Sequence, residues 1–376
     1  MSSEQDAIRL YSSSEDEEED TKCNQDVTVT EAGEPKDSFR LTAFDEEDDS
    51  EEEEKKSTPP VKQAASTEDE ECAMANKTLT TQAPPRTASS SAMRSTLLRF
   101  DLFFAGADPA MQKRLQKALD VMRSAIDIFG LEGVCFSFNG GKDSTVVLHL
   151  LRIVVAKRVL EETQQAHVKA QQEADDGPKT VTSPRNSFVS AELLQEDELE
   201  SRVKEQLQRV PVMYFDSYDQ FPEVREFTEE CTKKFELSCH VYKCSFVEGV
   251  KDILEKLKIK GIYMGVRGGD PYTEDMEHFS PSSPGWPPFL RVNPILQWTY
   301  ADVWSFLRDC QLEYCSLYDH GYTSLGNIFD TVQNPELWRK GEDGKEGYYL
   351  PAYELKDGSS ERCGRQKKAH TTSKSE

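Results

Sequence analysis

The sequence predicts an α/β fold, with a doubly wound, mostly parallel sheet and helices on both of its faces. Short apolar runs typical of buried strands alternate with segments whose apolar residues recur at helical spacing. Such alternation is typical of βαβ units, which build parallel sheets. A Gly-Gly turn also stands between the first strand and the helix after it, where a helix start is expected. The predicted strands are 133–137, 212–215, 240–242 and 261–266.

The predicted helices have recognisable ends. The first begins at Asp108 and Pro109, an N-cap residue followed by proline at the first helical position, and it ends at Gly130. Its apolar residues at 111, 115, 119, 122, 126 and 129 share one face. A second helix begins near Asp143, and further helices are predicted over 221–235, 246–257 and 300–308.

Two segments interrupt this alternation. Residues 161–205 are rich in Gln, Glu and Asp, contain Gly177-Pro178, and keep no sustained apolar period, so we expect a flexible exposed insertion. Residues 270–288 are rich in Pro, Ser and Gly. They lie close to core elements, so we expect a substrate loop there rather than a linker.

Acidic runs and Ser/Thr/Pro-rich stretches fill residues 1–94. We expect a disordered tail there, because such a composition cannot bury enough apolar surface to offset the entropy lost on ordering. Of the net charge of -24, -14 lies in residues 1–100, which hold 25 acidic and 11 basic residues. The folded domain is predicted over 95–365, and residues 366–376 are expected to be disordered.

The composition also excludes several kinds of partner. The folded part keeps a net charge of -10, which disfavours nucleic acid, since its binders need a basic face. No apolar run is long enough, and free enough of charge, to span a membrane, and the N-terminus lacks the apolar core of a secretory signal. Nine cysteines include no C-x-x-C pair, which argues against zinc-ribbon and redox motifs. We therefore expect a soluble cytoplasmic protein that binds small molecules. The sequence does not determine the oligomeric state, and we slightly favour a monomer.

The segment Ser137–Ser144, with the sequence SFNGGKDS, joins the first strand to a helix. Backbone N–H groups at the helix start, two glycines and Lys142 together predict a phosphate-binding loop. It is not a Walker A loop, because Phe136 stands where that motif has its first glycine and Asp143 where it has Ser or Thr. The alternative is a plain Gly-Gly turn with Asp143 as a capping residue, but the flanking strand and helix favour the phosphate loop.

A second two-glycine turn, 267–271 with the sequence RGGDP, follows the last predicted strand. Its spacing can place Arg267 on a phosphate and the Asp270 carboxylate on Mg²⁺. Taken alone, the turn fits a surface ion pair equally well.

The loop Ser137–Ser144 resembles the pyrophosphate loop of the ATP pyrophosphatases, whose fold is adenine nucleotide alpha hydrolase-like. Further segments at 285–298, 300–304, 314–326, 350–355 and 361–365 follow one another as in the eukaryotic FAD synthases. Residues 108–365 therefore resemble that family, the FMN adenylyltransferases of the PAPS-reductase-like superfamily. The resemblance implies transfer of AMP from ATP to the phosphate of FMN, with Mg²⁺ as cofactor and with FAD and pyrophosphate as products.

The resemblance also implies roles for individual residues. The ATP-binding set is Ser137, Asn139, Gly140, Gly141, Lys142, Asp143 and Ser144. The FMN-binding set is Arg267, Asp270, Pro271, Trp286, Pro287, Arg291 and Arg365, with Asp270 also expected at the metal. The catalytic set is Asn139, Lys142, Asp143, Arg267, Arg362 and Arg365, the last two reaching the phosphates from a mobile segment near the C-terminus.

Two details qualify these expectations. An indole can stack on isoalloxazine, which favours Trp286 as the flavin contact, while Trp298, Trp304 and Trp338 are expected in the core. Many family members carry polar side chains where this chain has Gly268 and Gly269. Glycine N–H groups are the donors that could replace those side chains.

Other functions fit parts of the sequence. Cys363, within Glu361–Arg365, invites comparison with the nucleophile of phosphoadenosine-phosphosulfate reductase, although an arginine intervenes in the motif. A non-catalytic ATP-binding scaffold is a further alternative, and the intact loop Ser137–Ser144 argues against it. The acidic composition and the absence of paired cysteines disfavour tRNA thiolation.

Overall fold

A computed structural model describes residues 92–174, 194–341 and 346–366. All of them belong to one compact unit, Pro60–Glu376. The predicted acidic tail lies outside the described residues except for 92–94, and so does the predicted C-terminal segment except for residue 366. In the described parts of the chain, no helix combines the length and apolar character needed to cross a bilayer.

A six-stranded sheet forms the centre of this unit, with strand order β3-β2-β1-β4-β6-β5. Its strands are β1 (Val134–Ser137), β2 (Val212–Phe215), β3 (Cys239–Tyr242), β4 (Gly261–Tyr263), β5 (Phe279–Pro281) and β6 (Leu290–Val292). The first five in spatial order run parallel, and β5 at the edge is antiparallel to β6. The predicted doubly wound, mostly parallel sheet is confirmed.

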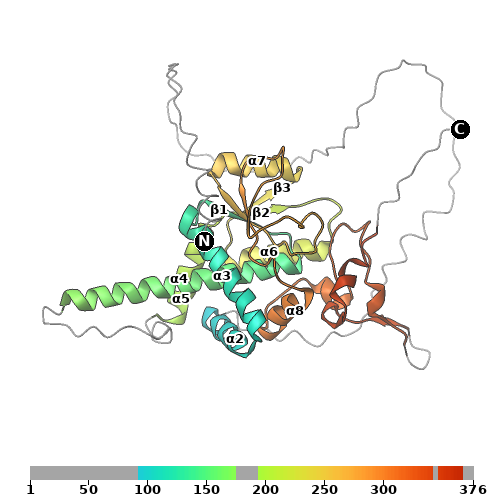
Figure 1. Ribbon diagram of the computed structural model, residues 1–376, viewed down its shortest axis with the longest axis horizontal. Coiled ribbons are helices and arrows are strands. Elements are labelled where there is room, and N and C mark those ends of the chain that lie inside the picture. The colour runs from blue at the N-terminus through green and yellow to red at the C-terminus, as the bar shows by residue number, and fades with distance from the viewer. Residues whose placement is uncertain (1–91, 175–193, 342–345, 367–376) are drawn as a thin grey trace, which may run out of the picture. The chain divides into compact units, whose positions relative to one another are not determined.

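Helices cover both faces of the sheet (Figure 1). Helices α3 (Pro109–Phe129), α4 (Lys142–Ala174) and α6 (Pro222–Phe235) lie on one face, and α7 (Phe246–Leu257) lies on the other. Alternation along β1 produces this arrangement, because Val134 and Phe136 join the apolar cluster with α3 and α4, whereas Cys135 joins the cluster with α7. The near-continuous apolar character of the strands reflects burial on both faces.

Several elements differ from the predictions. Helix α2 (Met93–Gly106) was not predicted, because its apolar residues do not share one face: Leu97 and Phe100 are buried while Leu98 and Leu102 are exposed. The predicted strand 261–266 is shorter, since β4 ends at Tyr263. Strand β5 lies within the predicted substrate loop, and both β5 and β6 have three residues, too few to give a strand signal.

Helical structure occupies both ends of the segment 161–205, for which an insertion was predicted. Helix α4 continues to Ala174, and α5 spans Glu196–Gln208. Leu199, Val203 and Leu207 of α5 are buried at four-residue spacing, a pattern that the surrounding charged residues obscured. Residues 175–193 of the segment lie outside the described residues.

Helix α8 (Tyr300–Asp309) follows the sheet, and short elements complete the fold. Trp298 and Trp304 are buried as predicted. The prediction for Trp338 is wrong, because it lies exposed in a two-stranded ribbon and packs edgewise on Tyr349. The short elements are η2 (Ser316–His320), η3 (Pro335–Leu337), β7 (Trp338–Arg339), β8 (Tyr348–Tyr349), η4 (Ala352–Glu354) and η5 (Gly358–Arg362).

The strand order reverses between β1 and β4. From β1 the chain adds β2 and β3 on one side, and then crosses to place β4 and β6 on the other. In sheets of this kind ligands bind outside the carboxyl ends of the strands at such a reversal, because the loops there diverge to opposite faces. The two predicted two-glycine segments, Ser137–Ser144 and 267–271, overlap the loops after β1 and β4, which span 138–141 and 264–270.

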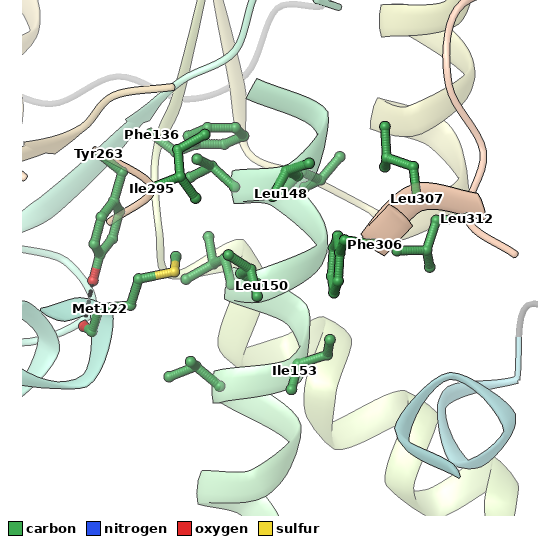
Figure 2. Packing of buried hydrophobic residues seen from close by; sticks show 14 of the residues in the cluster. Met122, Phe136, Leu148, Leu150, Ile153, Tyr263, Ile295, Phe306, Leu307 and Leu312 are labelled. Atoms are coloured by element: carbon green, nitrogen blue, oxygen red, sulfur yellow. Dashed lines mark hydrogen bonds between the residues drawn. The ribbon is translucent and has the colours of Figure 1, made fainter. Parts of the chain in front are cut away.

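The core near this reversal holds one polar contact that can be tested. Figure 2 shows Tyr263 of β4 pointing at α3, where its hydroxyl donates to the backbone carbonyl of Met122 at 2.7 Å. Neither residue is exposed. The hydrogen bond therefore ties α3 to the sheet at a fully buried position.

We expect Tyr263→Phe to lower the free energy of unfolding by about 0.5–1.5 kcal/mol, the net value of one hydrogen bond. Urea unfolding would measure this change. Tyr348→Phe, at an exposed position of β8, is the matched control and should leave the midpoint unchanged. Equal stabilities of the Tyr263→Phe variant and the unsubstituted protein would contradict this role of the hydroxyl.

Candidate active site

The loop between β1 and α4 packs too closely on α6 to carry a side chain at Gly140. That residue has φ +69°, and a Cβ there would lie 2.9 Å from Val224 Cγ1 and 3.0 Å from Thr228 Oγ1. Positive φ and a close neighbour both require glycine. Gly141, the second glycine of the pair, therefore lies directly before Lys142, the first residue of α4.

Side chains hold the loop in shape. Asn139 Oδ1 accepts hydrogen bonds from the Gly141 amide at 3.0 Å and from Ser144 Oγ at 2.6 Å. The hydroxyl of Tyr318, from η2, accepts from the Lys142 amide at 2.8 Å. Two of the backbone donors predicted to face an anion are thus engaged by the protein itself. Asn139, predicted as a ligand contact, organises the loop in this structure.

Four charged side chains from three segments meet beside this loop. Arg267, from the turn after β4, lies 2.6 Å from Asp143 Oδ1 through Nε and 2.6 Å from Glu361 Oε2 through Nη2. Lys142 Nζ lies 3.0 Å from Asp143 Oδ2 and also pairs with Glu361 Oε1. We call Lys142, Asp143, Arg267 and Glu361 the charge cluster. It contains two cations and two carboxylates, so its formal charge is zero.

The two cations of the cluster are buried, and the pairing affects the pKa values of Asp143 and Arg267. Burial alone would raise the pKa of Asp143, but the neighbouring Lys142 and Arg267 outweigh it and hold the pKa below its ordinary value. Burial likewise opposes the charge on Arg267, and the Asp143 and Glu361 carboxylates raise its pKa in spite of this. Lys142 is 2% exposed and Arg267 5%. A buried cation is tolerated only with such partners.

Aromatic rings enclose the lysine. Lys142 Nζ lies 5.4 Å from the ring centroid of Tyr300 and 5.9 Å from that of Tyr318. Burial, with a contribution from the Asp143 carboxylate, raises the pKa of Tyr318 well above its ordinary value, so its hydroxyl stays protonated. The rings exclude water around Lys142 and strengthen its electrostatic interactions.

Hydrogen bonds to other protein atoms engage the backbone amides of the turn after β4. Asp270 Oδ2 accepts from the Arg267 amide at 2.9 Å. The Gly268 amide donates to the Leu296 carbonyl at 2.6 Å, and the Gly269 amide donates to Thr273 Oγ1 at 3.2 Å. The two glycine amides are therefore not available to replace missing side-chain contacts, as the sequence suggested they could be. Pro271 is exposed at the outer end of the turn.

Of the predicted FMN-binding residues, Trp286, Pro287 and Arg291 lie together on the α7 side of the sheet, whereas Arg267, Asp270, Pro271 and Arg365 lie elsewhere. Trp286 packs against Phe246 at the start of α7, with ring centroids 5.2 Å apart. The Arg291 guanidinium lies 5.3 Å from the Trp286 ring and donates to Pro281 O at 2.6 Å and Ser283 Oγ at 2.7 Å. Arg291 thus fixes the loop that carries Trp286 and Pro287.

The two predicted C-terminal arginines do not join the charge cluster. Arg365 Nη2 lies 3.3 Å from Asp330 Oδ2, and its guanidinium rests on Gly326, where a Cβ would come within 2.0 Å. Arg362 is exposed. Their neighbour Glu361 occupies the cluster instead. Glu361 lies within the segment Glu361–Arg365, for which only the two arginines were predicted to have a role.

Fold and site together define a class of protein. A glycine-rich loop at a helix start, two buried cations and a position at the reversal of strand order are the features of an α/β protein that binds a small phosphorylated ligand.

Comparison with known proteins narrows that class. The sequence profile of the phosphoadenosine phosphosulfate reductase domain matches residues 133–247 and 244–333. A probable FAD synthase of Schizosaccharomyces pombe is 34% identical over 256 residues, which cover 68% of this chain and 80% of the relative. A probable FAD synthase of Caenorhabditis elegans is 33% identical over 67% of this chain, which spans 40% of that longer relative.

Solved structures agree on the fold. The FMN adenylyltransferase of Candida glabrata, in complex with FAD and inorganic pyrophosphate, superposes with a TM-score of 0.54 at 21% identity, over 74% of this chain and 97% of that one. A yeast FAD synthetase in complex with FAD superposes with a TM-score of 0.52 at 21% identity, over 73% of this chain and 98% of that one. This chain belongs to the FAD synthase family of the phosphoadenosine phosphosulfate reductase-like superfamily.

The close approach of the β4 turn to the phosphate loop can be tested at Gly265. A Cβ there would lie 2.7 Å from the Ser144 amide nitrogen and 2.9 Å from its Cα. We expect Gly265→Ala to displace the start of α4, to cost about 1–3 kcal/mol of stability through overpacking, and to weaken binding of inorganic pyrophosphate.

Calorimetric titration with pyrophosphate would measure the effect on binding. Gly106→Ala is the control, because a Cβ at Gly106 meets nothing within 4 Å. Unchanged pyrophosphate affinity in Gly265→Ala would show that contact between the two loops does not shape the site.

Proposed function

We propose that this protein is an FMN adenylyltransferase, which transfers AMP from ATP to the phosphate of FMN and releases pyrophosphate. The observation that carries the proposal is the meeting of Lys142 and Arg267 beside the loop Ser137–Ser144, next to the turn that follows β4. Relatives named as FAD synthases support it. So do solved neighbours that are FMN adenylyltransferases in complex with FAD and pyrophosphate, or with FMN and an ATP analogue.

The chemistry asks for positioning and charge neutralisation rather than proton transfer. The phosphate of FMN is already anionic at neutral pH, so it can attack the α-phosphorus of ATP without a general base. Attack forms a phosphorus–oxygen bond in FAD, and the bond to the β-phosphate breaks as pyrophosphate leaves. Lys142 and Arg267 offset the charge of the phosphates, and their low exposure strengthens that effect.

A magnesium ion fits this site only in partnership with the substrate. In the described parts of the chain, no group of three or more His, Cys, Asp or Glu lies close enough together to hold a metal ion. Mg²⁺ takes few protein ligands and many phosphate oxygens at nucleotide sites, so one carboxylate, such as Asp270 or Asp143, suffices. When bound, the ion would supply further neutralisation of the phosphate charge.

The loop of Trp286 is the proposed flavin contact. Its indole is partly buried on Phe246 and fixed by Arg291, so one planar surface is held in place before a ligand arrives. Stacking on such a surface costs little side-chain entropy. In this proposal Arg291 does not contact FMN itself but holds the loop that carries Trp286 in position. We also propose a cytoplasmic location, action as a monomer and independence from nucleic acid, and the acidic composition supports the last of these.

The first test of this function is the reaction itself. Purified protein with ATP, FMN and Mg²⁺ should form FAD and pyrophosphate in equal amounts, followed by chromatography of the flavins. The reductase alternative requires Cys363 as its nucleophile. Adenylyl transfer does not use this exposed thiol, so Cys363→Ser should keep full FAD formation. Binding of ATP and FMN without turnover would favour the scaffold alternative.

We propose that Arg365 leaves Asp330 and reaches the phosphates during the reaction. Arg365→Ala should then keep the fold and reduce FAD formation by about 100- to 1000-fold, as loss of a charge-stabilising donor does in other enzymes. The fold should persist because the ion pair of Arg365 with Asp330 is partly exposed and so worth little. Arg339→Ala, at an exposed position of β7, is the control and should keep full activity. Full turnover by Arg365→Ala would remove Arg365 from the catalytic set.

Trp286→Leu should raise the KM for FMN about fivefold, the factor that corresponds to loss of one aromatic stacking contact, while the KM for ATP stays the same. Steady-state kinetics with each substrate varied in turn would measure both. Trp338→Leu, on the exposed ribbon, should change neither. A rise in the KM for ATP alone would show that Trp286 contacts ATP and not FMN.

A further inference from the structure

One carboxylate covers both cations of the predicted phosphate site. Glu361 directs Oε1 to Lys142 and Oε2 to Arg267, at 2.6 Å in the second case. The two cations come from different sides of the strand-order reversal, Lys142 after β1 and Arg267 after β4. A carboxylate that bridges two cations in this way presents its oxygens as a phosphate would.

Burial makes this arrangement consequential. Lys142 is 2% exposed and Arg267 5%, and Glu361 is one of the groups that surround them. A phosphate cannot contact the N–H groups that Glu361 occupies while its carboxylate stays there. Keeping both would also add negative charge to a cluster whose two cations already face two carboxylates.

The surroundings indicate which part of Glu361 moves. Its backbone carbonyl accepts from Thr323 Oγ1 at 2.6 Å, and Asn334 Nδ2 donates to the Ser360 carbonyl at 2.8 Å and to Thr323 Oγ1 at 3.0 Å. Thr323 and Asn334 are buried. The backbone of η5 is therefore anchored at this point, and the side chain can leave the cations by rotation without unfolding the turn.

Asp143 is the less mobile of the two carboxylates. It is the second residue of α4, where the helix dipole favours a negative charge, and it contacts both Lys142 and Arg267. Glu361 has no helix dipole to hold it, because η5 is a single short 3-10 turn. When a third anion binds the two cations, we therefore expect the Glu361 carboxylate, and not that of Asp143, to move away from them.

We propose that Glu361 is a positioning residue that stands in for a substrate phosphate. Its carboxylate holds Lys142 and Arg267 in place in the empty site, is displaced when the pyrophosphate part of ATP binds, and returns as pyrophosphate leaves. This inference deepens the proposed adenylyl transfer and rests on it for the identity of the ligand. It predicts that Glu361 weakens ground-state binding of pyrophosphate and speeds its release.

The test compares Glu361→Gln with the unsubstituted protein in binding of inorganic pyrophosphate, measured by calorimetry without flavin. Removing the competing charge should tighten pyrophosphate binding about fivefold, the factor that corresponds to one net hydrogen bond. Glu354→Gln is the matched control: it removes the same charge from η4, where Glu354 pairs with the exposed Lys356 at 3.4 Å. It should leave the affinity unchanged.

Turnover gives a second readout. With ATP and FMN, Glu361→Gln should show stronger product inhibition by pyrophosphate and a lower kcat, while Glu354→Gln behaves as the unsubstituted protein. A purely structural role would instead weaken pyrophosphate binding. Equal or weaker affinity in Glu361→Gln would overturn the proposal.

Loss of a partner for two buried cations can also destabilise the empty protein, so Glu361→Asp serves as a second variant. Its shorter side chain reaches one cation at a time and should give intermediate affinity. In addition, the melting temperature of Glu361→Gln should rise more with added pyrophosphate than that of the unsubstituted protein. An equal rise in both would contradict the proposal.

The outcomes separate this inference from the proposed function. If the unsubstituted protein forms FAD and Glu361→Gln does not bind pyrophosphate more tightly, the role of Glu361 fails and the function stands. If Glu361→Gln binds pyrophosphate more tightly but no FAD forms, the proposed function fails, and the carboxylate still competes with an anion of another reaction.

Discussion

Two buried cations that follow the carboxyl ends of two adjacent strands are the constraint on which the site depends. Lys142 and Arg267 are almost fully buried, and a positive charge in such a place requires anionic partners. Asp143 and Glu361 provide them in the empty protein, and the proposed function gives phosphates the same role during reaction. The charge cluster therefore links the fold, which sets where the cations stand, to a chemistry that needs neutralisation more than it needs acids or bases.

The sheet topology produces this meeting. Strand order reverses between β1 and β4, so the loops after these neighbouring strands open toward the same crevice. Gly140 lets the first loop rest on α6, and Gly265 lets the second loop reach the start of α4. Helix α7 on the opposite face carries Phe246, against which Trp286 packs. The charge cluster thus lies beyond the carboxyl ends of β1 and β4, and the proposed flavin contact packs on α7, which covers one face of the same sheet.

Much of this could be predicted from the sequence, for identifiable reasons. The strands β1, β2 and β3 and the amphipathic helices carry strong periodic signals, and the glycines, lysine and flanking strand and helix of the segment Ser137–Ser144 are typical of a phosphate-binding loop. The three-residue strands β5 and β6 carry no such signal. Glu361 lies far along the chain from its partners, and nothing local marks a glutamate that will be buried between a lysine and an arginine. The hydrogen bonds of the Gly268 and Gly269 amides and the contact of Arg365 with Gly326 are also tertiary contacts, which the local sequence does not reveal.

The central claim is that the site breaks ATP between its α- and β-phosphates and passes the adenylyl group to FMN. The most direct measurement follows a label placed at the α-phosphorus of ATP in one reaction and at the γ-phosphorus in another, with FMN and Mg²⁺ present. Our account predicts that the α-label appears in FAD and the γ-label in pyrophosphate. Release of the γ-label as inorganic phosphate, or its appearance in the flavin, would contradict it.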